Sequence, residues 1–469
     1  MSGSAVQPAP DETALRRREQ RGWCWYDWAN SVFPTSIVTV FLSLYLTEVA
    51  VGAARTDLAR NGPSPCPGEN SLVRCDVSLL GLQFPAGSLW GYLLSVATVV
   101  QVLVLPITGA IADRTQNKRG MLAVFAFGGA GFTALLALVA GTNWQLAVPV
   151  FVLANICYGV SVVVYYSVLP EIADADERDG VSSRGWAFGY LGGGLALAVQ
   201  LAVFLGHEAL GLSTGDAVRV CFVLSGAWWA VFTLIPLARL RRHQPPQGSE
   251  RGAAVLTAGF RQLGVTLREA RMFPLTLGFL GAYLVFTDGI STVTRVSALY
   301  GDQELRLPQE TLIATILLVQ FVAFGGALLH GRVARHVGAK RTILGSLVVW
   351  IAVIGAAYFL QAGQQLQFYG LAVGIGLVLG GTNALSRSLF SQMVPPGREA
   401  AYFSLYEIGE RSTSWLGPLL FAGIGQATGS FRLAIVSLVA FFVIGFVATA
   451  LVPVRRAIRA AGNPEPAVV

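Results

Sequence analysis

Charged and hydroxyl side chains recur at helical spacing inside apolar stretches of this chain. Asp288, Ser291, Thr292 and Arg295 stand at i, i+3, i+4 and i+7, which places them on one face of a helix. Such a stripe favours a site that binds a zwitterion or carries a proton at Asp288. It is equally typical of an ion pair between helices, with Arg295 reaching toward the membrane surface.

A second stripe has the same spacing and consists of Glu407, Glu410, Arg411 and Ser414. Glu407 and Arg411 form an i, i+4 pair and can neutralise each other, which leaves Glu410 as a group that can titrate. The alternative is that these charges lie at the cytoplasmic end of their helix and reach water.

Polar residues also mark three other apolar segments. Asp27, Asn30 and Ser31 share a helix face beside several aromatic residues, which predicts either a pathway or gate, or an interfacial anchor. The other polar residues are Asn155, Tyr158, Ser161, Tyr165 and Tyr166 in one segment, and Asn383, Ser386 and Arg387 in another. Of these, we take Asp27, Asn30, Asn155, Tyr158, Tyr165, Asn383 and Arg387 as further candidates for a substrate or proton pathway.

Motifs for catalysis or cofactor binding do not occur in the sequence. It has no GxxxxGK[ST] loop for ATP, no HExxH, and no Cys/His cluster among its four histidines. We therefore expect no enzyme activity, no metal site and no cofactor.

The composition indicates where these polar residues must sit. Hydrophobic residues make up 54% of the 469 residues, charged residues only 13%, and the mean hydropathy is +0.59. This predicts an all-α polytopic membrane protein, because a bilayer accepts apolar surface that water does not. We expect twelve transmembrane helices, at 24–52, 89–112, 121–140, 145–168, 185–206, 216–239, 273–298, 309–330, 342–361, 366–390, 402–427 and 430–453.

The cations orient these helices. Most Arg residues fall in alternate short loops, which predicts that both termini are cytoplasmic. This distribution also argues against nucleic-acid binding as the reason for the net charge of +7. The apolar run after Arg21 is too long for a typical signal peptide, so we expect it to remain as the first span.

The polar stretch 240–272 is predicted to be a cytoplasmic linker between two six-helix bundles, at 1–239 and 273–469. The loop from about 53 to 88 holds Cys66 and Cys75, which could form a disulfide if that loop is extracellular.

A short motif appears in both halves. Gly109, Asp113, Arg114, Lys118 and Arg119 follow the second span, and Gly331, Arg335, Lys340 and Arg341 follow the eighth at matching offsets. This echo indicates a parallel repeat of six plus six helices. We expect the charged loop to act as a conformational switch, although Arg335 replaces the acid in the second copy.

The first copy resembles the loop motif of the major facilitator superfamily. Three further stretches resemble its vacuole-effluxer-like branch, which is related to the fungal autophagy-linked vacuolar amino-acid exporter. They are Trp25–Ser31, Leu169–Tyr190, and Ala384–Phe390 with Ser414–Pro418. The resemblance implies a two-bundle fold, alternating access and export of small molecules.

We therefore expect a secondary active transporter that exports a small polar solute, with an amino acid as one candidate and drugs or sugars as the alternative substrates. The central cavity should be lined by spans one, four, seven and ten. The expected partners are the lipid bilayer, a small-molecule substrate and protons, and the expected state is a monomer in the plasma membrane. Only two of the 33 Lys and Arg residues are lysines, which is typical of a GC-rich bacterium. The alternative is a membrane protein that does not transport solutes, such as a lipid scramblase or receptor.

Overall fold

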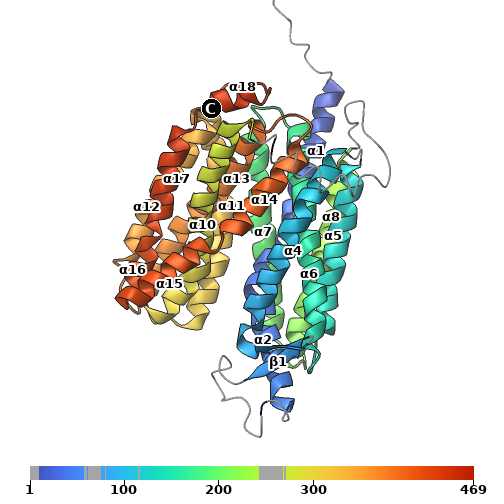
Figure 1. The fold of residues 1–469 in the computed structure, drawn as a ribbon, viewed down its shortest axis with the longest axis vertical. Helices are drawn as coiled ribbons and strands as arrows, with labels where there is room; N and C mark the ends of the chain where they lie inside the picture. Colours follow the sequence, from blue (N-terminus) through green and yellow to red (C-terminus); the bar gives the residue numbers. More distant parts are fainter. Residues whose placement is uncertain are drawn as a thin grey trace, which may run out of the picture.

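The computed structural model describes residues 10–57, 61, 75–79, 81–114, 117–241, 268 and 271–468. Figure 1 shows two groups of helices that lean against each other. The first group comprises α1 (Pro10–Asn30), η1 (Phe33–Phe41), α2 (Leu42–Thr56), η2 (Ala86–Ser88), α4 (Leu89–Arg114), α5 (Lys118–Leu135), η3 (Leu136–Leu138), η4 (Trp144–Leu146), α6 (Ala147–Ile172), α7 (Arg178–Leu205) and α8 (Thr214–Arg239).

The second group comprises α10 (Pro274–Gln303), α11 (Gln309–Val337), α12 (Ala339–Ala357), α13 (Gln365–Gln392), α14 (Glu399–Thr413), α15 (Leu416–Thr428), α16 (Phe431–Ser437), α17 (Val439–Leu451) and α18 (Val454–Ala460). The predicted linker 240–272 lies almost entirely outside the described residues.

Two ends of the molecule can be told apart in Figure 1. The termini end carries α18 and the start of α1. The hairpin end carries β1 (Asp76–Leu79) and β2 (Leu82–Pro85), which pair antiparallel with Val77 opposite Phe84. Cys75, beside β1, is disulfide-bonded, whereas its predicted partner Cys66 lies outside the described residues.

Eleven helical stretches of the described residues are long and apolar enough to cross a bilayer. These stretches match eleven of the twelve predicted segments. Their number and length agree with a twelve-helix membrane fold. The remaining segment, 402–427, is split between α14 and α15 at Ser414 and Trp415. Because each part is too short to span alone and α14 carries several charges, this segment does not behave as one apolar helix.

The first span is longer and less regular than predicted. Its helix begins at Pro10. Gln20 attaches this extension to the end of α6 and the loop after it, by donating hydrogen bonds to the carbonyl oxygen of Ile172 and to Glu177, both at 2.9 Å. Its middle is a π-helix, η1, which begins beside Pro34, and Thr39 donates to the Pro34 carbonyl oxygen at 2.7 Å. Wide turns of this kind often occur at functional sites.

Close helix contacts in the second group depend on glycine. A methyl group on Gly326 of α11 would lie 2.3 Å from the carbonyl oxygen of Leu377 on α13. One on the adjacent Gly325 would meet nothing within 4 Å. Small residues at such interfaces let helix backbones approach closely in a membrane.

We predict that Gly326→Ala destabilises the protein by about 1–3 kcal/mol, because the added methyl group must push α11 away from α13. Gly325→Ala is the matched control and should leave stability unchanged or slightly raised, since alanine is the better helix former. Thermal unfolding of the detergent-purified variants measures both. Equal melting temperatures for the two variants would contradict the packing shown here.

Candidate functional site

Arg387, on α13 of the second group, is fully buried among side chains of the first group. Its guanidinium carbon lies 4.8 Å from the ring centres of Trp23 and Tyr166, and 5.5 Å from that of Trp186. Cations over aromatic faces are attracted by the ring quadrupole, most strongly where water is excluded. The aromatic residues of α1, α6 and α7 therefore form a cage for an arginine that comes from the other half of the chain.

Two polar groups complete the cage. Asp27 on α1 accepts a hydrogen bond from Arg387 at 3.2 Å and one from the Tyr165 hydroxyl at 2.7 Å. Arg387 also donates to the hydroxyl and carbonyl oxygens of Ser182, both at 2.9 Å. A methyl group on Gly185 would lie 2.6 Å from the Asp27 carboxylate, so only glycine leaves room for this pair. We call Asp27, Tyr165, Ser182 and Arg387, with the aromatic rings around them, the Arg387 cluster.

More hydrogen bonds join α7 to α13 between the Arg387 cluster and the termini end. The Ser388 hydroxyl donates to Asp179 at 2.6 Å, and the Ser182 hydroxyl donates to the Ala384 carbonyl oxygen at the same distance. Arg178 donates to the carbonyl oxygen of Ser391 at 3.0 Å. Together with the cluster, these bonds hold the two groups of helices together at the termini end.

The charged loop after α4 contributes a third connection. Asp113 accepts hydrogen bonds from the backbone amides of Ala400 and Ala401, both at 2.8 Å, in the first turn of α14. A carboxylate at a helix N-terminus satisfies free amides and interacts favourably with the helix dipole. A methyl group on Gly109 would lie 2.7 Å from the Ala400 carbonyl oxygen, so the glycine permits this approach. Lys118 pairs with Glu171 at 2.6 Å, within the first group.

The stripe on α14 lies nearer the centre of the molecule. Glu407 pairs with Arg411 at 3.0 Å, and the guanidinium carbon of Arg411 lies 6.0 Å from the Tyr158 ring of α6. Glu410 accepts a hydrogen bond from Tyr283 at 2.9 Å and has no ion pair among the described residues.

The stripe on α10 contacts the break between α14 and α15. Asp288 accepts a hydrogen bond from the Gly417 amide at 2.8 Å, in the first turn of α15. Its other carboxylate oxygen and the Thr292 hydroxyl are buried without a partner in the described part of the chain. Arg295 donates to the Ser414 carbonyl oxygen at 3.3 Å, and Ser291 is half-buried. The stripe thus stabilises the interrupted helix, rather than joining Asp288 to Arg295.

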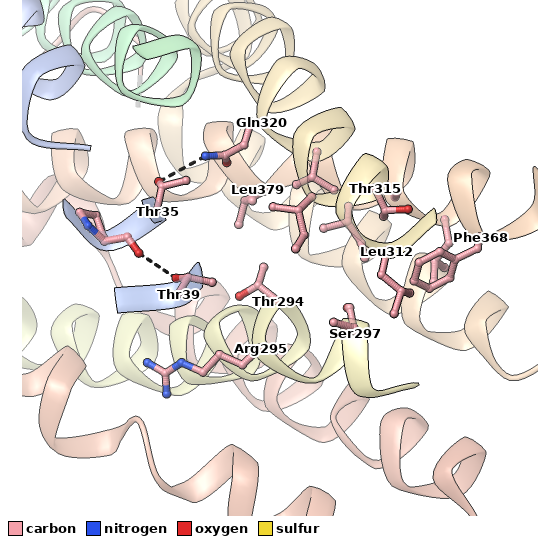
Figure 2. Close-up of a pocket in the computed structure, with 17 residues that line it drawn as sticks. Thr35, Thr39, Thr294, Arg295, Ser297, Leu312, Thr315, Gln320, Phe368 and Leu379 are labelled. Atoms are coloured by element: carbon pink, nitrogen blue, oxygen red, sulfur yellow. Dashed lines mark hydrogen bonds between the residues drawn. The ribbon is translucent and has the colours of Figure 1, made fainter. Parts of the chain in front are cut away.

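A cavity of about 380 Å³ lies between the two groups (Figure 2). Its walls come from η1, α10, α11 and α13, so α11 lines it where the sequence predicted span four. Arg295 is the only charged residue among its described lining residues, and its polar groups come from Thr35, Thr39, Thr294, Ser297, Thr315 and Gln320. Gln320 donates to Thr35 across the two halves at 3.3 Å. On α13 the lining ends at Leu379, eight residues and thus about 12 Å before Arg387.

The remaining predicted residues lie apart from this cavity. Asn155 and Gln101 hydrogen-bond to each other, with the Asn155 amide 3.2 Å from the Gln101 oxygen. Asn30 and Asn383 each have one buried side-chain atom with no hydrogen-bond partner among the residues that the structure describes. Lys340 donates to the carbonyl oxygens of Ala450 and Val452. Arg119 is half-buried and Arg341 is exposed. The side chain of Arg114 is not among those that the structure describes.

Sequence reasoning did not select Ser182, Asp179, Ser388 or the cavity residues Thr35 and Gln320. A lone hydroxyl in an apolar helix carries no signal of its own, because it can satisfy itself on the preceding turn. Arg387 offered the one usable signal, since a buried guanidinium requires partners on neighbouring helices.

The fold and this inter-half site define a class: a polytopic membrane transporter built on the major facilitator fold. In agreement, the structure of the proton:xylose symporter XylE, a major facilitator superfamily protein, superposes with a TM-score of 0.65 over 94% of this chain and 96% of that one, at 14% identity. Residues 15–462 match the family model described as vacuole effluxer Atg22 like, and the chain belongs to that family.

Its relatives are transporters and not enzymes. The chain is 28% identical to the MFS-type transporter YxiO of Bacillus subtilis, over 93% of this chain and 95% of that protein. It is 25% identical to autophagy-related protein 22-1 of Penicillium rubens, over 97% and 93%. These matches favour a transporter over a receptor or a scramblase.

We predict that Asp27→Asn and Arg387→Gln each destabilise the protein by about 3–5 kcal/mol, because each leaves a buried partner uncompensated. The double variant should lose less than the sum of the two single variants. Thermal unfolding of all three completes the cycle.

The partly exposed pair Arg219 and Asp216, 2.8 Å apart at the hairpin end, is the control. Neutralising its members should change stability by only about 0–1 kcal/mol. Additive effects in the Asp27 and Arg387 cycle would show that the two side chains are not coupled.

Proposed function

We propose that this transporter moves a small polar solute by alternating access, with the conformation described here closed at the termini end. The observation that carries the proposal is the position of the cavity relative to the Arg387 cluster. The cavity lies between the halves on the hairpin side, and three sets of inter-half bonds lie on the other side. Rocking of one half against the other would break these bonds and expose the cavity to the opposite compartment.

The cavity chemistry supports a solute that carries a carboxylate. Ligand sites for small molecules are typically about 300–1,000 Å³ and mostly apolar, with a few polar groups that fix orientation. A cavity of about 380 Å³ with hydroxyl groups and one arginine fits this description. No acidic residue is among the described lining residues, and Arg295, which donates to the Ser414 carbonyl oxygen, has no carboxylate partner there and can pair with an anionic group of the solute. An amino acid is the first candidate, and a sugar, which needs no such cation, is the second.

We predict that Arg295→Gln raises the KM for a transported amino acid about 10–100-fold, because a charge-assisted hydrogen bond contributes about 1.5–3 kcal/mol. Flux of labelled solute into proteoliposomes measures the effect. Arg55→Gln, which removes an exposed charge at the end of α2, is the control and should leave KM unchanged. An unchanged KM in Arg295→Gln would favour an uncharged solute.

Proton coupling requires a carboxylate that can gain and lose a proton as the halves move. Asp27, Asp288 and Glu410 are the candidates from the sequence. Asp27 is paired with Arg387 and Asp288 is bonded to the Gly417 amide. Within the described part of the chain, the Glu410 carboxylate has only the Tyr283 hydroxyl as a hydrogen-bond partner. We therefore propose Glu410 as the coupling group.

We predict that Glu410→Gln abolishes solute accumulation driven by a pH gradient but retains solute exchange at equal pH. Solute exchange at equal pH requires only that the two halves move against each other. Accumulation driven by a pH gradient also requires a group that carries the proton. Glu48→Gln on α2, at an exposed position, is the control and should keep both activities. Full gradient-driven accumulation by Glu410→Gln would exclude this role for Glu410.

Location and direction are part of the proposal. The Arg-rich loops of the termini end support a cytoplasmic position for both termini. Membership of the vacuole-effluxer-like family supports export, and the excess of arginine over lysine, typical of a GC-rich bacterium, supports the plasma membrane. The fungal relatives are named for autophagy, so their membrane need not be that of this chain. We propose that the transporter acts as a monomer, since each chain contains both halves that the cavity requires.

A further inference from the structure

The second copy of the charged motif lies beside a small basic cavity at the termini end. This cavity, of about 210 Å³, is lined by Gly180, Ser183, Arg184, Leu328, Gly331, Arg332 and Arg335. We call it the α7–α11 pocket. It lies between α7 of the first half and α11 of the second, and none of its described lining residues lines the solute cavity.

The α7–α11 pocket corresponds by position to the contact between Asp113 and α14. A methyl group on Gly109 would lie 3.1 Å from Cβ of Ser404, and one on Gly331 would lie 2.6 Å from Cβ of Ser183. Ser404 and Ser183 each stand five residues after the first residue of their helix, α14 or α7. The two glycines therefore approach equivalent serines on equivalent helices.

The charges at the two positions are opposite. Four residues after Gly109, Asp113 accepts the amides of Ala400 and Ala401. Four residues after Gly331 stands Arg335, which cannot accept a hydrogen bond. The corresponding amides, of Asp179 and Gly180, have no hydrogen-bond acceptor among the described residues. The second contact thus lacks the negative group that completes the first.

Other groups in the pocket also require an acceptor. The Ser183 hydroxyl is buried, with the residue 1% exposed, and has no partner within the described ranges. Arg332 and Arg335 form no ion pair with any described residue, and Arg184 donates only to the Gly180 carbonyl oxygen at 3.1 Å. The carboxylate of Asp179, which precedes the lining residue Gly180 in the sequence, accepts a hydrogen bond from Ser388 on α13. Three cations and a buried hydroxyl without a partner thus line this pocket, and none of its described lining residues is acidic.

We propose that the α7–α11 pocket binds a phosphate-bearing anion, supplied by the headgroup of an anionic phospholipid. The phosphate would supply between α7 and α11 the charge that Asp113 supplies between α4 and α14, and so stabilise the closed termini end. Basic pockets between transmembrane helices bind anionic headgroups in this manner. A lipid is favoured over free phosphate because Leu329, Val333 and Val337, at i, i+4 and i+8 on α11, are exposed apolar side chains that an acyl chain can cover.

The test measures the melting temperature of the full-length protein in detergent as dioctanoyl phosphatidylglycerol is added, with dioctanoyl phosphatidylcholine and inorganic phosphate in parallel. We expect stabilisation by phosphatidylglycerol only, since a ligand that binds the folded state raises its stability. Stabilisation by inorganic phosphate alone would keep the anion site but overturn the lipid as its source. An equal response to phosphatidylcholine would overturn the proposal.

Three variants locate the effect. Arg332→Gln with Arg335→Gln should raise the phosphatidylglycerol concentration needed for half the shift about 20-fold. Arg455→Gln with Arg456→Gln, both exposed at the same end on α18, is the charge-matched control and should respond as the parent does. Arg335→Asp should be stable without lipid and unresponsive to it, because its carboxylate can accept the free amides. Equal weakening in the control pair, or a full lipid response in Arg335→Asp, would overturn the site.

Discussion

The structure depends on one constraint: a fully buried guanidinium that belongs to one half of the chain has all its partners in the other. Burial of Arg387 would be prohibitive without the carboxylate of Asp27, the Ser182 oxygens and the aromatic faces around it. None of these partners lies on α13. The two halves therefore pack against each other in a single register. Sliding one half along the other would leave the Arg387 charge in an apolar site without its partners. Gly185 takes part in the same constraint, since any larger residue would displace the carboxylate.

The two copies of the charged motif show how one repeat yields two different contacts. In both copies a glycine brings a helix end against the first turn of a helix from the other half. Asp113 then satisfies two amides directly, whereas Arg335 turns the equivalent position into a basic pocket. The first contact is self-sufficient, and the second depends on what the surroundings supply. An arginine in place of the acid at position 335 can thus make one of two equivalent inter-half contacts depend on a lipid.

The sequence predicted most of the fold, because apolar length and the distribution of arginines follow directly from the bilayer. It missed the break at Ser414, since helix interruption depends on the partner that Asp288 provides for the Gly417 amide. Helical spacing predicted polar faces at Asp27, Arg387 and Glu407, and in the structure each of these residues has a partner of opposite charge. It could not pair Asp27 with Arg387, which are 360 positions apart, nor find Thr35 and Gln320 in the cavity wall. Those juxtapositions arise from tertiary packing, which leaves no periodic signal in either segment.

The Arg387 cluster also bears on how such a transporter can open. Breaking a buried ion pair is expensive only while both charges stay buried, and exposed charges of the same kind interact by less than about 1 kcal/mol. If the halves separate at the termini end, water reaches Asp27 and Arg387 as their contact is lost. The free energy of the open state relative to the closed state is then much lower than the destabilisation caused by deleting one partner of the pair would suggest. A solute or proton needs to supply only a few kcal/mol of differential affinity to shift the population, which is within the range of a single charge-assisted contact. The Asp27 and Arg387 pair can therefore fix how the two halves pack when the termini end is closed and still allow the halves to separate during transport.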